Sequence, residues 1–140
     1  MMRKLAAGVV VCMVWSNTAF AEMVVIVHKS NPVTSVSVDT LTKYYKKTVE
    51  LWDSGAEVDP VDLPDDNPLA VEFTDTVLEL TIGVKNSMWS IRTSSGLGTP
   101  PRQLPDEAAV VSYVASTRGA IGYVDRAQAD DSVKIVDVAF

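Results

Sequence analysis

The stretch of residues 92–102 holds the side chains best suited to bind a small anion. It carries an arginine at each end, with serines and glycines between them. Arginine makes paired hydrogen bonds to oxyanions, hydroxyls donate further bonds, and glycine lets backbone amides approach a ligand closely. The pattern predicts a small-oxyanion site formed by Arg92, Ser94, Ser95, Gly96, Gly98 and Arg102. The alternative is a structural loop whose arginines pair with carboxylates, since the spacing matches no phosphate-loop motif.

A second candidate is the acidic turn that contains Asp62, Asp65, Asp66 and Asn67. Its oxygen atoms are the ligands that Ca²⁺ prefers, but the alternate-residue spacing of a helix–loop–helix calcium site is absent. A helix start explains the same residues more simply, with Asn67 as the cap and Pro68 at the first helical position. We therefore expect no bound metal and no cofactor.

The residue inventory does not favour catalysis. His28 is the only histidine, and a lone histidine can neither assemble a zinc site nor act as a base without a placed nucleophile. The sequence holds no nucleophile–base pair in a motif context, no nucleotide loop and no carboxylate pair with distinct roles. The chain is predicted not to be an enzyme.

The N-terminal segment is typical of a secretory signal peptide. Arg3 and Lys4 precede an apolar run at residues 5–15, which is too short to span a bilayer. Small and polar residues then end in Ala19, Phe20 and Ala21. We predict that residues 1–21 are cleaved and that residues 22–140 form one periplasmic domain without membrane insertion. Cleavage would remove the only cysteine, Cys12.

The charge balance limits the partners of the predicted mature chain. Of the 12 basic and 18 acidic residues, two basic ones lie in the segment 1–21, which leaves ten against eighteen and a net charge of −8. Nucleic acids and anionic membranes attract basic surfaces, so neither is an expected partner. Any anion site must arise from a local group of donors.

Hydrophobic patterns predict strands that alternate with helices. The strands are expected at residues 24–27, 58–63, 120–124 and 133–138. Helices are expected from the Ser37 cap to Lys47, from Pro68 to a break at Gly83, over residues 84–93, and from Pro105 to a left-handed stop at Gly119. Lysines at the end of the first helix suit a solvated helix end better than a binding patch. This alternation predicts an α/β domain with a mainly parallel sheet flanked by helices.

Several of these segments resemble, in order and spacing, one lobe of a type II periplasmic binding protein of the phosphate ABC importers. The segments are residues 24–27, 38–47, 51–55, 60–61 and the sequence GAIGYV at 119–124. The resemblance is closest to small exported members that share Trp89, Arg92, Gly96, Gly98, Pro100 and Pro101. It implies a binding protein with a single lobe, because 119 residues leave room for only one.

The resemblance also implies a phosphate loop, which this chain has altered. In the phosphate binders an arginine and a Ser-Gly-Thr run open the helix that holds the anion. Here the corresponding positions include Asp65, Asp66 and Asn67. The carboxylates of Asp65 and Asp66, with that of Asp62, would repel phosphate. Two functions remain open. One is a solute-binding protein that binds a small oxyanion and works with an ABC permease. The other is a periplasmic interaction module that binds itself, as a homodimer, or an envelope protein.

Overall fold

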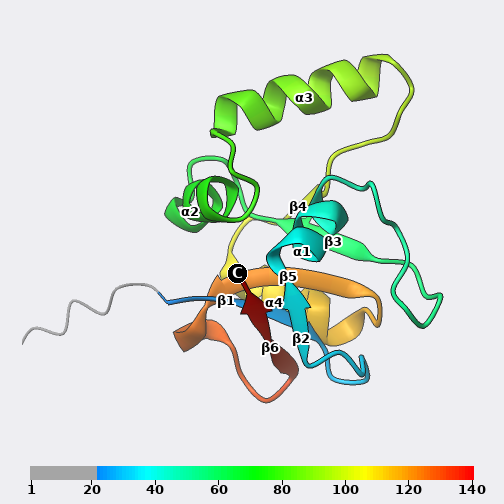
Figure 1. The fold of residues 1–140 in the computed structure, drawn as a ribbon. Coiled ribbons are helices and arrows are strands. Elements are labelled where there is room, and N and C mark those ends of the chain that lie inside the picture. Colours follow the sequence, from blue (N-terminus) through cyan, green and yellow to red (C-terminus); the bar gives the residue numbers. More distant parts are fainter. Residues whose placement is uncertain (1–21) are drawn as a thin grey trace, which may run out of the picture.

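The computed structural model describes residues 22–140, so the predicted signal peptide at 1–21 lies outside the described residues. The elements follow the order β1 (Met23–His28), β2 (Ser35–Ser37), α1 (Val38–Tyr45), β3 (Asp59–Asp62), α2 (Pro68–Thr76), α3 (Ile82–Ser94), β4 (Arg102–Gln103), α4 (Glu107–Ser116), β5 (Ala120–Asp125), the 3₁₀ turn η1 (Arg126–Gln128) and β6 (Val133–Ala139) (Figure 1).

The strands form one sheet in the order β2-β6-β1-β5-β3-β4. β1 pairs antiparallel with both β5 and β6, whereas β2 is parallel to β6 and β3 is parallel to β5 and β4. Five of the six strands therefore run in one direction, which confirms the prediction of a mainly parallel α/β sheet. The exception is β1, whose apolar run is buried on both faces as expected but pairs with antiparallel neighbours.

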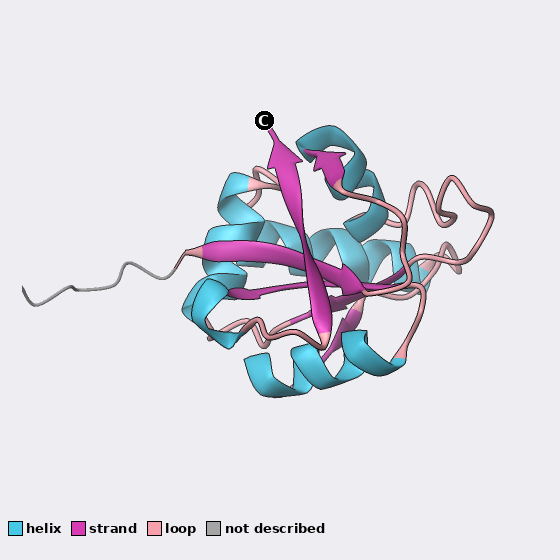
Figure 2. Cartoon of the chain, turned by 90° about the horizontal axis from the view of Figure 1, so that it is seen from below, coloured by secondary structure: helices cyan, strands magenta, loops and turns pink. Residues whose placement is uncertain are grey.

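Helices cover both faces of the sheet, as Figure 2 shows. Successive side chains of a strand point to opposite faces, and β5 illustrates this. Gly122 faces α4, since a Cβ atom there would lie 2.6 Å from Cγ1 of Val110. The next residue, Tyr123, faces α1 and α2, where its ring stacks on Phe73 with centroids 4.1 Å apart and lies 6.1 Å from the Tyr45 ring. The core is thus built from two apolar layers with the sheet between them.

Two helix starts confirm the predicted caps. The Ser37 hydroxyl accepts a hydrogen bond from the backbone amide of Thr40 at 3.1 Å, and α1 follows. The Asn67 side chain accepts one from the amide of Leu69 at 2.9 Å, and Pro68 is the first residue of α2. Each cap satisfies an amide that the helix itself leaves without an acceptor.

Other helix limits differ from the predictions. Asp106, rather than a residue before Pro105, caps α4, and this helix ends at Ser116. Gly119 lies beyond the helix and does not have a positive φ. A glycine is needed there for space, because a Cβ atom would lie 2.1 Å from the carbonyl oxygen of Glu57. Gly83 does not break a helix; it is the second residue of α3.

These glycines give a first testable prediction. Gly119→Ala should lower the free energy of unfolding by about 1–3 kcal/mol, because the backbone at Glu57 would have to move. Gly83→Ala is the matched control, since a Cβ atom there meets nothing within 4 Å and alanine favours the helix. Urea denaturation should therefore show opposite signs for the two variants. Equal stabilities would contradict the close contact at Gly119.

Among residues 22–140, no helix is long and apolar enough to cross a membrane.

Candidate functional site

A cavity of about 540 Å³ lies beneath α3, which stands apart from the sheet at the top of Figure 1. We call it the α3 cavity. Six buried residues form its floor: Tyr45, Asp62, Leu78, Lys85, Trp89 and Pro101. Six more form its rim: Asn86, Ser90, Thr93, Ser94, Pro100 and Gln103.

An ion pair lies in the floor of this cavity. Asp62 is the last residue of β3, and Lys85 lies in the first turns of α3. The Lys85 ammonium is 3.3 Å from Oδ2 of Asp62 and 3.2 Å from Oδ1 of Asp65. The side chains of Lys85 and Asp62 are only 5% and 7% exposed, so each charge depends on the other for compensation. The pair fixes α3 to the end of β3.

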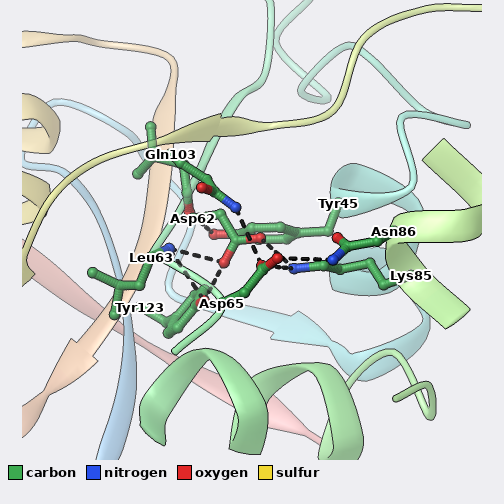
Figure 3. A network of polar contacts seen from close by, with 9 residues as sticks. Tyr45, Asp62, Leu63, Asp65, Lys85, Asn86, Gln103 and Tyr123 are labelled. Carbon is green, nitrogen blue, oxygen red and sulfur yellow. Dashed lines mark hydrogen bonds and ion pairs between the residues drawn. The ribbon is translucent and has the colours of Figure 1, made fainter. Parts of the chain in front are cut away.

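The second oxygen of Asp62 completes a buried polar network (Figure 3). It accepts hydrogen bonds from the Tyr123 hydroxyl and from the backbone amide of Leu63, the latter at 2.9 Å. The hydroxyl of Tyr45 donates to the carbonyl oxygen of Val61 at 2.8 Å. Burial, and secondarily the Asp62 carboxylate, raises the pKa of Tyr123 and of Tyr45 well above the ordinary value of 10.0. Both hydroxyls therefore stay protonated donors.

Asp65, in the turn after β3, links two elements, α3 and β4. Its carboxylate accepts hydrogen bonds from Asn86 of α3 at 2.8 Å and from Gln103 of β4 at 3.2 Å, besides the contact with Lys85 (Figure 3). Burial by itself raises the pKa of Asp65. The hydrogen bond from Asn86 and the charge of Lys85 outweigh burial and bring this pKa below its usual 3.8. Asp65 is thus a carboxylate that holds α3 and β4 together.

This lowered pKa predicts acid sensitivity at Asp65. A carboxyl group whose pKa is lower in the folded state stabilises the protein above its unfolded pKa, and that contribution is lost as the pH falls through the folded value. Stability should therefore decline as the pH drops below about 3.8. Asp65→Asn should flatten that decline in acid denaturation followed by circular dichroism, whereas Asp66→Asn, at an exposed neighbour, should not. An identical decline in Asp65→Asn would contradict the assignment.

The two arginines of the predicted oxyanion site have separate partners. Arg92 donates to the carbonyl oxygen of Lys46 at 2.6 Å, and its guanidinium lies 4.6 Å above the Trp89 ring. The guanidinium of Arg102 lies 5.3 Å from the centre of the Tyr113 ring on α4. Neither arginine lines the α3 cavity, so the structure does not bring them together there.

The remaining residues of that predicted site lie at the end of α3. Ser94 lines the cavity rim, and its hydroxyl donates to the carbonyl oxygen of Ser90. Ser95 is the C-cap of α3. Gly96 and Gly98 have φ angles of 73° and 128°, which side chains rarely adopt, so the loop requires glycine for its own path.

The acidic turn is a helix start rather than an open ligand set. Asn67 caps α2, while Asp66 is exposed. The Lys85 ammonium occupies the space between Asp62 and Asp65, where a bound cation would have to lie. Across residues 22–140, no group of three or more histidine, cysteine, aspartate or glutamate side chains could hold a metal ion.

The sequence interpretation missed three functional candidates, Lys85, Gln103 and Tyr123, and named Trp89 only as a residue of the family resemblance. One signal was available: Lys85 and Trp89 are four residues apart, so they share a face of α3. A lysine on the face that buries a tryptophan needs a carboxylate partner. Gln103 and Tyr123 carried no such local signal, because their roles depend on pairing between β3, β4 and β5.

Several solved structures share the fold of this chain. The chain is similar to a Clostridium perfringens protein solved with bound phosphate and assigned as a phosphate ABC transporter substrate-binding protein, at 22% identity and a TM-score of 0.65. It is also similar to an ABC-type phosphate transport receptor from Vibrio cholerae (15%, 0.62) and to PstS from Borrelia burgdorferi (15%, 0.64). These matches cover 83%, 83% and 84% of this chain but 44%, 45% and 48% of those chains. The chain thus spans less than half the length of these structures, and at this identity the likeness shows the fold.

A search of curated proteins finds no match to the sequence. A family model described as a PBP superfamily domain matches residues 16–138, nearly the whole chain. The match agrees with the resemblance carried by the segments between residues 24 and 124, and with the α/β fold described above. The chain belongs to the PBP superfamily domain family.

Proposed function

We propose that this protein is an exported, non-enzymatic solute-binding protein and that its ligand occupies the α3 cavity. The observation that carries the proposal is the position of the cavity. It opens where β3 and β4 end, at Asp62 and Gln103, and ligands of open α/β sheets bind beyond the carboxyl ends of the strands. Its volume of about 540 Å³ lies within the ordinary range for small-molecule sites.

The floor of the cavity supports binding rather than catalysis. Its two charged side chains, Asp62 and Lys85, compensate each other and are held by further bonds. A general acid or base needs to exchange its proton with a substrate, which a carboxylate with both oxygens occupied does poorly. Fixed polar groups and an aromatic residue such as Trp89 are the usual lining of a pocket that selects a ligand.

The export part of the proposal is supported by the basic and apolar pattern at residues 1–21 and by the family, whose phosphate-transport members suggest an ABC permease as partner. We expect the protein recovered after expression of the full chain in a Gram-negative host to begin at Glu22. Mass spectrometry of the periplasmic fraction measures this directly. A full-length product that stays in the cytoplasm would contradict export.

A matched pair of variants on α3 tests the site. Calorimetric titration of the full chain, expressed and purified as the cell releases it, should detect at least one ligand among phosphate, sulfate, glucose, maltose, ribose and spermidine. Ser90→Trp places a large ring at the rim and should abolish that binding. Ser87→Trp, on an exposed position of the same helix outside the cavity, should leave it intact. Silence with every solute, or equal binding by both variants, would remove the α3 cavity as the site.

An oxyanion bound by the loop at 92–102 is the alternative location for a ligand. The loop glycines leave backbone amides accessible, and the structurally similar Vibrio cholerae protein is a phosphate transport receptor. Arg102→Ala tests this alternative, because that guanidinium contacts Tyr113 rather than the α3 cavity. Phosphate binding that is lost in Arg102→Ala and kept in Ser90→Trp would place the ligand on the loop.

One observation favours a second function, an interaction module. Val84, Ile91 and Leu97, on α3 and its following loop, are 53%, 68% and 69% exposed. Apolar side chains gathered on one element are typical of a surface that a partner protein covers. Light scattering should then show a homodimer that Ile91→Asp converts to a monomer. A wild-type monomer would exclude self-association.

A further inference from the structure

We infer that the α3 cavity selects a neutral solute that carries several hydroxyl groups, such as a sugar or a polyol, and excludes free oxyanions. This inference rests on the proposed function, because it takes the cavity to be the ligand site. It concerns the chemical class of the ligand, which follows from the charges and hydrogen-bonding groups that the cavity presents.

The cavity offers no free positive charge. Among the described residues that line it, only Asp62 and Lys85 are charged, and they pair with each other. Asp65 lies directly behind Lys85 and shares its ammonium group, so the three side chains together carry one net negative charge. A divalent anion would have to draw Lys85 away from two carboxylates in a buried place. The Asp62 carboxylate could not move with Lys85 toward the anion, because Tyr123 and Leu63 both donate hydrogen bonds to its other oxygen.

The rim offers neutral groups that both donate and accept hydrogen bonds. Ser90 and Thr93 contribute hydroxyls, and Asn86 and Gln103 contribute amides. The Ser94 hydroxyl is an acceptor only, because its hydrogen goes to the carbonyl oxygen of Ser90. Asp65 uses one N–H of each amide, which leaves Asn86 and Gln103 each with one N–H donor and one carbonyl acceptor toward a ligand. An ammonium group has three hydrogens, and Lys85 spends two of them on carboxylates. A molecule with several hydroxyls matches this mixture, since each hydroxyl donates and accepts.

The rest of the lining is apolar and suits the carbon skeleton of such a solute. Trp89, Leu78 and Pro101 lie in the floor, and Pro100 lies at the rim. A sugar presents C–H groups between its hydroxyls, and these gain from leaving water at an apolar surface. A fully hydrated phosphate ion has no apolar part that could use these contacts.

Titration calorimetry of the purified full-chain product with glucose, ribose, maltose and glycerol, beside inorganic phosphate and sulfate, tests the inference. At least one of the neutral solutes should bind saturably, with a dissociation constant that changes less than twofold between low and high salt because no net charge is exchanged. Neither anion should bind. The double variant Ser90→Ala/Thr93→Val removes two rim hydroxyls and should weaken binding about tenfold, since each hydrogen bond is worth a few-fold. Ser87→Ala, on the outer side of α3, is the control.

The outcomes separate the inference from the proposed function. Binding of phosphate or sulfate that Ser90→Trp abolishes would overturn the inference and keep the solute-binding function. Silence with all neutral solutes would overturn the inference, and silence with phosphate, sulfate and spermidine as well would overturn both. Sugar binding that Ser90→Ala/Thr93→Val leaves unchanged would place the sugar elsewhere and overturn the assignment to the cavity.

Discussion

Replacing Lys85 with methionine should lower the free energy of unfolding by about 3–5 kcal/mol, the cost of leaving a buried charge without its partner. Methionine keeps much of the length of the side chain, so the loss reports on the charge rather than on packing. Asp62 would stay buried, with Tyr123 and Leu63 as its remaining donors. Urea denaturation followed by circular dichroism measures the change.

Lys43 provides the matched control. It forms a 2.9 Å ion pair with Asp39 on α1, but the two side chains are 50% and 75% exposed. Exposed pairs contribute about 0–1 kcal/mol, so Lys43→Met should be nearly neutral. Similar losses in the two variants would show that Asp62 does not depend on Lys85.

The Lys85 variant also has a local consequence. α3 is held to the sheet by polar contacts of Lys85 and Asn86 with the carboxylates at the end of β3, and by the bond from Arg92 to Lys46. Removing the first of these contacts should let α3 open more often than the rest of the domain. Limited proteolysis should then cut Lys85→Met first between α3 and β4, in the exposed stretch 94–100. First cleavage elsewhere would mean that the contacts of α2 suffice to hold α3.

Local patterns predicted the parts of the fold that depend on local physics. The β-branched run at the start of β1 and the caps Ser37 and Asn67 each act through neighbours in the chain. The short strands β2 and β4 were missed because they have three and two residues. They are strands only because β6 and β3 lie beside them, and nothing in three residues encodes that pairing.

The site was harder to predict for the same reason. Residues 92–102 combine arginine, serine and glycine in one stretch, which drew attention to a local pattern. The polar network instead joins Asp62 to Lys85, 23 positions away along the chain, and to Tyr123, 61 positions away. Only the fold brings them together. That the turn at 65–67 departs from the phosphate loop of the family stays a prediction, whereas the cap at Asn67, a local feature, is confirmed.

Alkaline conditions should unfold this protein cooperatively above pH 10. Tyr45 and Tyr123 have pKa values raised far above 10.0, mainly by burial, and their rings pack with Phe73 at the centre of the core. A raised folded-state pKa stabilises the protein fully below the unfolded value and loses that contribution as the pH rises. Each tyrosine then costs about 1.4 kcal/mol for every pH unit above 10, so the two together remove about 5 kcal/mol by pH 12.

The order in which tyrosinate absorbance appears and secondary structure is lost tests this prediction. If both hydroxyls are neutral donors in the fold, their tyrosinate absorbance should appear together with the loss of secondary structure and not before it. Tyr45→Phe removes one ionisable group and also the hydrogen bond to Val61. The free energy of unfolding of this variant should fall less steeply with pH, by the slope that corresponds to about one proton released per molecule. Tyr113→Phe is the control, because that side chain is partly exposed and its pKa is raised by burial and by the hydrogen bond to Asp59 without being enclosed. Ionisation of Tyr45 and Tyr123 in a chain that is still folded would mean that water reaches the floor of the α3 cavity, and the buried pairing of Asp62 with Lys85 would then lose its physical basis.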